Sequence, residues 1–210
     1  MPHFPPPPKL PARTGLFDRV PPAIFPPVLG LLGLVAAWGR ATEAFGTPKA
    51  PIDLAFGAIP LLFLFCAIAY ASKVLRRPAA LAEDIRTLPG RTGIAALCLC
   101  FMVLAGLLAP LSPGLGKISL GAGAIGLLVL AVFILPKRLQ GTDTAGPITP
   151  AMHLIFVGFI LIPPASVALE VLRPALPWII AYCALAALFI TATTIAPMVT
   201  RNLAPPLRPL

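Results

Sequence analysis

The sequence predicts an all-α integral membrane protein with six transmembrane helices. Of its 210 residues, 58% are hydrophobic and 11% are charged, and the mean hydropathy is +0.94. A soluble domain is about 45–50% apolar and about 25% charged, so this chain has too few charged groups to cover a water-facing surface. Its apolar residues form six runs, each close to the about 20 residues that cross a bilayer. The runs lack the alternation of barrel strands, which favours helices.

The N-terminal residues 1–19 precede the first run and are polar and rich in proline, with four consecutive prolines at 5–8. This composition predicts a disordered or polyproline tail. A cleaved signal peptide is the alternative, because basic residues precede the short apolar stretch 28–37. The length of the leader and the position of Arg40 near the expected cleavage site favour the uncleaved tail.

The six runs define a membrane domain over residues 20–199, and residues 200–210 have a loop-like composition. The runs cover residues 20–38, 52–74, 92–111, 118–135, 150–172 and 177–199. Small residues recur four positions apart, as in Ser119 with Gly123 and in Gly33 with Ala37. This spacing lets helix backbones approach closely, so it predicts tight packing within the chain, with a dimer contact as the alternative.

Lysine and arginine are distributed unevenly over the predicted loops. The N-terminus, the second and fourth loops and the C-terminus hold 12 of the 16. The positive side of a membrane protein faces the cytoplasm, so both termini are predicted to be cytoplasmic. The net charge of +9 does not indicate nucleic-acid binding, because the basic residues lie in short gaps between apolar runs. The second loop holds the largest group, namely Lys73, Arg76, Arg77, Arg86 and Arg91.

Ionisable groups inside a membrane usually mark proton relays, pumps or ligand counter-ions. Here Asp53, Glu170 and Arg173 lie near the ends of runs, and His153 lies about one turn inside the fifth. The sequence holds no H-E-x-x-H cluster and no Lys in the middle of a run. The four cysteines lie within apolar runs, where free Cys behaves as a small hydrophobe. We therefore expect no catalytic residue, no metal site and no cofactor.

Two proline pairs lie inside the apolar runs, Pro26–Pro27 in the first and Pro163–Pro164 in the fifth. A proline inside a helix removes an N–H bond and kinks the helix. In a bilayer such breaks are tolerated where the backbone is buried in protein or lines a cavity. A break also creates a half-helix N-terminus that favours an anion, here through amides near 28–30 and 165–167 and the Ser166 hydroxyl. The alternative is a kink that only improves packing.

The first run, VPPAIFPPVLGLLGLVAAW at 20–38, resembles the first helix of the tellurite-resistance/dicarboxylate transporter family. That family includes the bacterial TehA-type proteins and the plant slow anion channels. Residues 81–84 (LAED) and 88–91 (LPGR) resemble its second loop, and residues 148–153 (ITPAMH) resemble the entry to its fifth helix. The resemblance implies a ten-helix, trimeric protein of the bacterial inner membrane. Odd-numbered helices would form an inner ring around the pore, and even-numbered helices would form an outer ring.

By this resemblance the chain spans the first six of the ten helices and passes small anions through a pore. The pore-shaping residues would be Pro26, Pro27, Pro163 and Pro164, and the candidate pore-lining residues are Phe25, His153, Phe156 and Ser166. The family's gating phenylalanine is on the ninth helix, beyond residue 210. Three inner helices cannot close a five-helix ring, so the chain is expected to be a truncated form. The alternative is a non-transporting six-helix structural or assembly subunit of a larger membrane complex.

Overall fold

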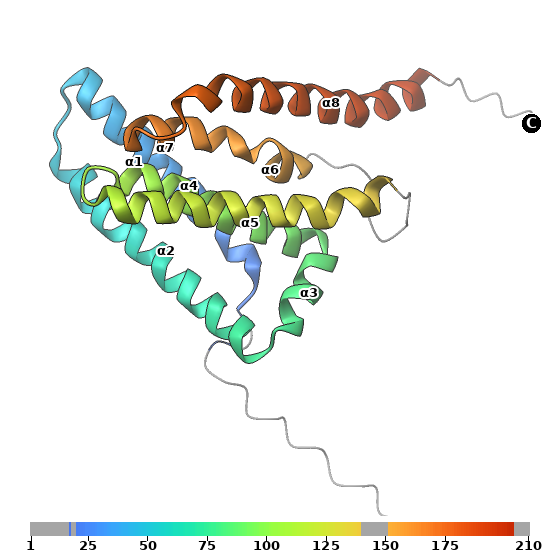
Figure 1. Cartoon of the computed structure of the whole chain (residues 1–210), viewed down its shortest axis with the longest axis horizontal. Helices are drawn as coiled ribbons and strands as arrows, with labels where there is room; N and C mark the ends of the chain where they lie inside the picture. The colour runs from blue at the N-terminus through green and yellow to red at the C-terminus, as the bar shows by residue number, and fades with distance from the viewer. Residues whose placement is uncertain (1–16, 18–19, 140–150, 204–210) are drawn as a thin grey trace, which may run out of the picture.

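Helices form every regular element of the computed structural model, which describes residues 17, 20–139 and 151–203 (Figure 1). Most of the predicted tail at 1–19, and residues 140–150 and 204–210, lie outside the described residues. The helices are α1 (Phe25–Phe45), α2 (Ala50–Arg76), α3 (Ala79–Arg86), α4 (Leu88–Leu108), α5 (Pro113–Leu139), α6 (Met152–Phe156), α7 (Ile162–Leu169) and α8 (Leu176–Leu203). Short 3-10 helices are η1 (Pro22–Ile24), η3 (Gly158–Leu161) and η4 (Arg173–Ala175).

Five of the described helices are long and apolar enough to cross a membrane, where the sequence predicted six. They are α1 with η1, α2, α4, α5, and α8 with η4. The fifth run does not form one continuous helix. It is divided into α6, η3 and α7, and its apolar helical part is the shorter stretch Gly158–Leu169. The prediction of an all-helical chain with long apolar helices that could span a membrane is therefore confirmed for the described residues, and a continuous fifth span is not found there.

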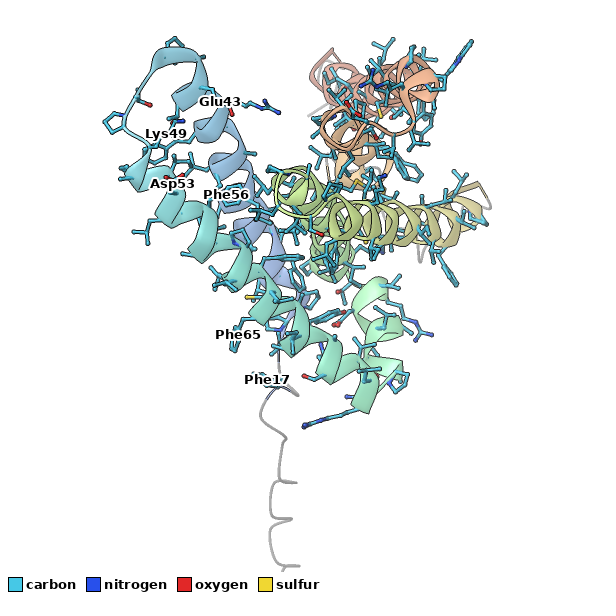
Figure 2. The ribbon with its side chains drawn as sticks, turned by 60° about the vertical axis from the view of Figure 1, so that its left-hand side comes forward. Phe17, Glu43, Lys49, Asp53, Phe56 and Phe65 are labelled. Atoms are coloured by element: carbon cyan, nitrogen blue, oxygen red, sulfur yellow. The ribbon has the colours of Figure 1, made fainter. Side chains whose placement is uncertain are left out.

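The first helix extends beyond the predicted apolar run, from residue 38 to Phe45. Gly46 ends it in the left-handed conformation, with φ 65°, and donates its backbone N–H to the carbonyl of Thr42. This is a common way to end a helix, since glycine adopts positive φ without a steric penalty. The tight turn that follows sends α2 back along α1. Figure 2 shows Glu43, Lys49 and Asp53 gathered around this turn.

The centre of the bundle is α4. In its most apolar stretch 61% of the residues are buried, whereas in the corresponding stretch of α8 only 11% are buried. Helix α4 contacts α1, α5 and α7, so helices from three parts of the chain pack around it. Its small side chains permit this close approach, among them Gly93, Ala95, Ala96 and Ala105. The core is therefore built around α4, and α2 and α8 expose large apolar side chains on the outside.

The contact between α4 and α5 uses the small residues that the sequence singled out. A Cβ on Gly123 would lie 2.5 Å from the carbonyl oxygen of Cys98. One turn earlier, the Ser119 hydroxyl donates to the carbonyl of Phe101 at 2.7 Å. The predicted close packing through Ser119 and Gly123 is confirmed. Gly33 on α1 instead has open space where a Cβ would be, so the same spacing there serves no close contact within the described chain.

Charged residues lie at the two ends of the bundle. The start of α1, the end of α2, α3 and the start of α4 meet at one end, where Lys73, Arg76, Arg77, Arg86 and Arg91 outnumber Glu83 and Asp84. The turn between α1 and α2 and the turn between α4 and α5 belong to the other end. This unequal charge is the basis of the predicted orientation, which stays a prediction.

The last helix, α8, extends through Leu203 and so includes residues 200–203, which the sequence assigned to a loop-like segment. Its contacts within the chain are with α6, η3, α7 and η4. Phe159 of η3 meets Tyr182 of α8 edge to face, with ring centroids 6.1 Å apart. Most of the outer face of α8 is left to the surroundings, and in a membrane that surrounding is lipid or another helix.

Candidate functional site

The two proline pairs occupy the same place in two helices. Pro26 and Pro27 lie in the first turn of α1, and Pro163 and Pro164 lie in the first turn of α7. Proline is tolerated there because the first amides of a helix have no partner within the helix. The prolines therefore begin their helices, as expected for breaks that create new helix N-termini.

A 3-10 turn precedes each pair, and the prolines explain it. In a continuous helix the N–H of residue 163 would bond to the carbonyl of Phe159, but Pro163 has no N–H. The N–H of Ile162 takes that carbonyl instead, in the tighter 3-10 pattern. The first helix shows the same pattern. Pro26 has no N–H to donate to the carbonyl of Pro22, and the N–H of Phe25 bonds to that carbonyl instead. The same chemistry thus gives η1 before α1 and η3 before α7.

Both starts contact the middle and C-terminal parts of α4. The carbonyl of Phe25 lies 3.8 Å from the Sγ of Cys100. The Cα of Ala165 lies 3.8 Å from where a Cβ on Gly106 would be. These two points are six residues apart on α4, which corresponds to about 9 Å along the helix axis. The N-terminal ends of α1 and α7 therefore contact α4 at points less than two helical turns apart.

The starts of α1 and α7 do not offer the backbone donors that the sequence suggested for an anion. At α7 the Ile162 N–H already bonds to Phe159, and Pro163 and Pro164 carry no N–H. The free amides that make a helix N-terminus an anion site are those of its first turn. The prolines occupy those positions, so the donors expected near 165–167 are not orphaned.

One polar group remains at the start of α7. The Ser166 side chain is fully buried, with 0% exposure, and its hydroxyl has no hydrogen-bond partner. Leaving a buried hydroxyl unpaired costs free energy, and such groups in native proteins call for a physical explanation. Ala165, its neighbour, packs on α4, and Leu169 packs on Gly116 of α5. Ser166 therefore lies in the part of α7 that fits between α4 and α5.

The other candidate residues lie in two separate places. Phe25 is fully buried and meets Phe63 and Tyr70 of α2 edge to face, at centroid distances of 6.5 and 5.6 Å. His153 and Phe156 belong to α6, and the Nε2 atom of His153 lies 3.3 Å from the Thr191 hydroxyl of α8. The whole of η3 lies between α6 and α7, so the structure does not bring His153 and Ser166 into one site.

Sequence reasoning missed a polar cluster at the positive end of the bundle. Tyr70 and Lys73 of α2 both contact the Asp84 carboxylate of α3. The spacing of Tyr70 and Lys73 places them on one helix face, but the sequence does not indicate which acidic residue they meet. Among the described residues, no group of three or more His, Cys, Asp and Glu side chains could hold a metal ion.

Comparison with known proteins identifies no family for this chain. No protein-family model, no curated protein and no solved structure matches it.

Proposed function

We propose that this protein is a membrane transport protein of the tellurite-resistance and anion-channel type, and that it passes small anions beside α1, α4 and α7. The observation that carries the proposal is the fully buried, unpartnered Ser166 hydroxyl at the proline start of α7. A hydroxyl in a bilayer interior is stabilised when it can donate to a passing solute or to water. Ser166 lies in the first half of α7, just after the break in the fifth run at η3, which contacts the central helix.

The charge pattern supports passive passage over active pumping. In the described part of the chain, the ionised side chains of the spans lie within the first or last two turns. A carboxylate-driven pump needs ionisable groups deep in the membrane. A neutral path lined by a few dipoles lets an ion enter and leave, because binding stays weak. The prolines contribute here too, since they remove the amide donors that would hold an anion tightly.

The test is anion flux into proteoliposomes that contain the folded protein. We would measure uptake of chloride, nitrate, sulfite and a C4-dicarboxylate under an imposed membrane potential. Flux of at least one of them above that of empty vesicles is expected. A folded protein that passes none of these anions would refute the proposal.

Two variants separate the proposed role of Ser166 from general damage. Ser166→Ala removes the unpartnered hydroxyl and is expected to lower the flux or change the order of anion preference. Thr194→Ala is the matched control, because its hydroxyl already donates within α8 to the carbonyl of Ile190 at 2.7 Å. Equal flux in both variants and the parent protein would exclude Ser166 from the path.

A second candidate function is a non-transporting subunit that stabilises a larger membrane complex. The observation that favours it is the sparse burial of α8, which presents large apolar side chains such as Trp178, Leu185 and Phe189 outward. Purification from native membranes under mild conditions would decide between them. A stoichiometric partner chain together with an absence of flux from the purified protein would support the subunit.

A further inference from the structure

The polar cluster at the positive end of the bundle joins three segments of the chain. The Asp84 Oδ2 atom accepts hydrogen bonds from the Tyr70 hydroxyl and from the Lys73 Nζ atom, each at 2.9 Å. Lys73 also donates to the backbone carbonyl of Val20 at 3.1 Å and lies 5.4 Å from the centre of the Tyr70 ring. One lysine thus connects the entry to α1, the last turn of α2 and α3.

This ion pair is shielded from water, which distinguishes it from the pair between Arg77 and Glu83. The side chains of Lys73 and Asp84 are only 13% and 20% exposed. The pair between Arg77 and Glu83, one residue away from Asp84, is 67% and 55% exposed. Exposed pairs contribute little because water and salt screen them, whereas removing one partner of a shielded pair leaves an uncompensated charge.

A residue with non-helical backbone angles lies at each end of α3. Arg77, between α2 and α3, has φ −139° and ψ 82°, and Thr87, between α3 and α4, has φ −92° and ψ 147°. Both lie outside the helical region, so rotation at these two residues moves the eight residues of α3 without unwinding a helix. Figure 1 shows α3 between the end of α2 and the start of α4.

Apolar burial holds α3 only weakly. Ala80 is its one fully buried apolar residue, and Leu81 and Ile85 are partly buried. The hydrophobic contribution scales with the apolar area removed from water, and an alanine contributes little of it. Polar contacts therefore hold α3 in place. They are the shielded contact through Asp84, the exposed pair of Glu83 with Arg77, and the bond from the Arg91 guanidinium of α4 to the Arg86 carbonyl at 3.1 Å.

The backbone of Asp84 also lies directly against α4. A Cβ on Gly90, in the first turn of α4, would collide with the carbonyl oxygen of Asp84. A Cβ on Gly93, one turn later, would collide with the carbonyl of Pro22 in η1. Lys73 thus connects α3 to Val20, just before η1, and both η1 and α3 press on the start of α4.

We propose that α3 is a strap that closes over the first turns of α4, and that the Asp84 carboxylate is its latch. Lys73 and Tyr70 hold the latch shut. Loss of the negative charge at Asp84 releases α3, which turns about Arg77 and Thr87 while α2 and α4 keep their places. The device is local, because it depends on one carboxylate and two hinge residues.

The experiment measures access to Ala80, the residue of α3 whose side chain faces the bundle and is 3% exposed. Ala80→Cys provides a thiol, and a water-soluble maleimide is supplied on both sides of proteoliposomes that contain the full chain. Labelling should be slow in this parent protein and at least about tenfold faster after Asp84→Asn, which corresponds to a shift of about 1.4 kcal/mol in the opening equilibrium. Glu83→Gln is the matched control and should leave the rate unchanged.

A second variant opens the strap without altering any charge. Gly90→Ala places a methyl group against the Asp84 carbonyl and should also accelerate labelling at position 80. Gly33→Ala has open space for its methyl group and should have no effect. These two variants keep the test decisive if Asp84→Asn does not fold.

Three outcomes would overturn the proposal. The first is fast labelling at position 80 in the parent protein, because the strap would then not be closed. The second is slow labelling in both Asp84→Asn and Gly90→Ala. The third is labelling of the buried native Cys98 and Cys100 at the same accelerated rate, since the bundle as a whole would then be opening.

Discussion

Gly123 at the α4–α5 contact allows a quantitative test of the packing. We consider Gly123→Ala with Gly121→Ala as its matched partner. Both glycines lie in α5, two residues apart and therefore on different faces of the helix. A Cβ at Gly121 would meet nothing within 4 Å. A Cβ at Gly123 would lie 2.5 Å from the carbonyl oxygen of Cys98 and 2.9 Å from the Cγ atom of Met102.

The expected energies follow from two opposing effects. Replacing glycine by alanine within a helix stabilises it by about 0.5–1 kcal/mol, and this gain applies at both positions. At Gly123 the new methyl group also meets rigid backbone, and such overpacking costs about 1–3 kcal/mol. Gly121→Ala should therefore stabilise the protein. Gly123→Ala should be about 1–3 kcal/mol less stable than Gly121→Ala.

The assay is reversible unfolding of the protein in mixed detergent micelles, followed by circular dichroism. The two variants and the parent protein are compared at the same micelle composition. If both variants stabilise the protein equally, α5 does not approach α4 at Gly123 and the packing described above is incorrect. If both destabilise it, the helix-propensity argument fails at Gly121.

Two further predictions concern single elements and use thermal unfolding in detergent. Leu172 has φ 55° and its side chain is 52% exposed. Leu172→Gly removes the steric penalty of this left-handed conformation and should raise the free energy of unfolding by about 0.5–1 kcal/mol. A loss of stability would contradict this prediction. The Thr87 hydroxyl accepts a hydrogen bond from the N–H of Gly90 at 3.2 Å at the start of α4, so Thr87→Ala should cost about 1 kcal/mol. Thr92→Ala, whose hydroxyl donates to carbonyls of its own helix, is the control, and an equal cost in both would exclude the capping role.

The break in the fifth run shows how far the sequence specifies local structure. Pro163 and Pro164 signal an interruption, and the structure has one. The interruption covers η3 at Gly158–Leu161 and so begins before the prolines. A proline removes a donor, and the carbonyl that loses its partner belongs to the residue four positions earlier. The sequence therefore indicates that the helix breaks, and the hydrogen-bond geometry decides where.

The same prolines explain why the helix starts lack the free amide donors that the sequence suggested. The sequence suggested that each break would expose amide donors, at 28–30 and at 165–167. In the structure Pro26–Pro27 and Pro163–Pro164 occupy the first turns themselves, so the positions that would be orphaned have no N–H to offer. What remains at α7 is the Ser166 hydroxyl, which the sequence also named.

Composition and hydropathy by themselves predicted the helical character and five of the six runs that form helices long and apolar enough to span a membrane, because a long uncharged run must satisfy its backbone internally in lipid. Only the tertiary structure decided which small residues form contacts. Ser119–Gly123 and Gly33–Ala37 have the same spacing, yet Gly123 contacts α4 and Gly33 faces open space. The spacing shows that a helix face has small side chains, but it does not specify which helix packs against that face. The meeting of Lys73 and Asp84 was likewise decided by the fold. Two charges 11 residues apart pair because the turn at Arg77 brings α3 back beside the end of α2.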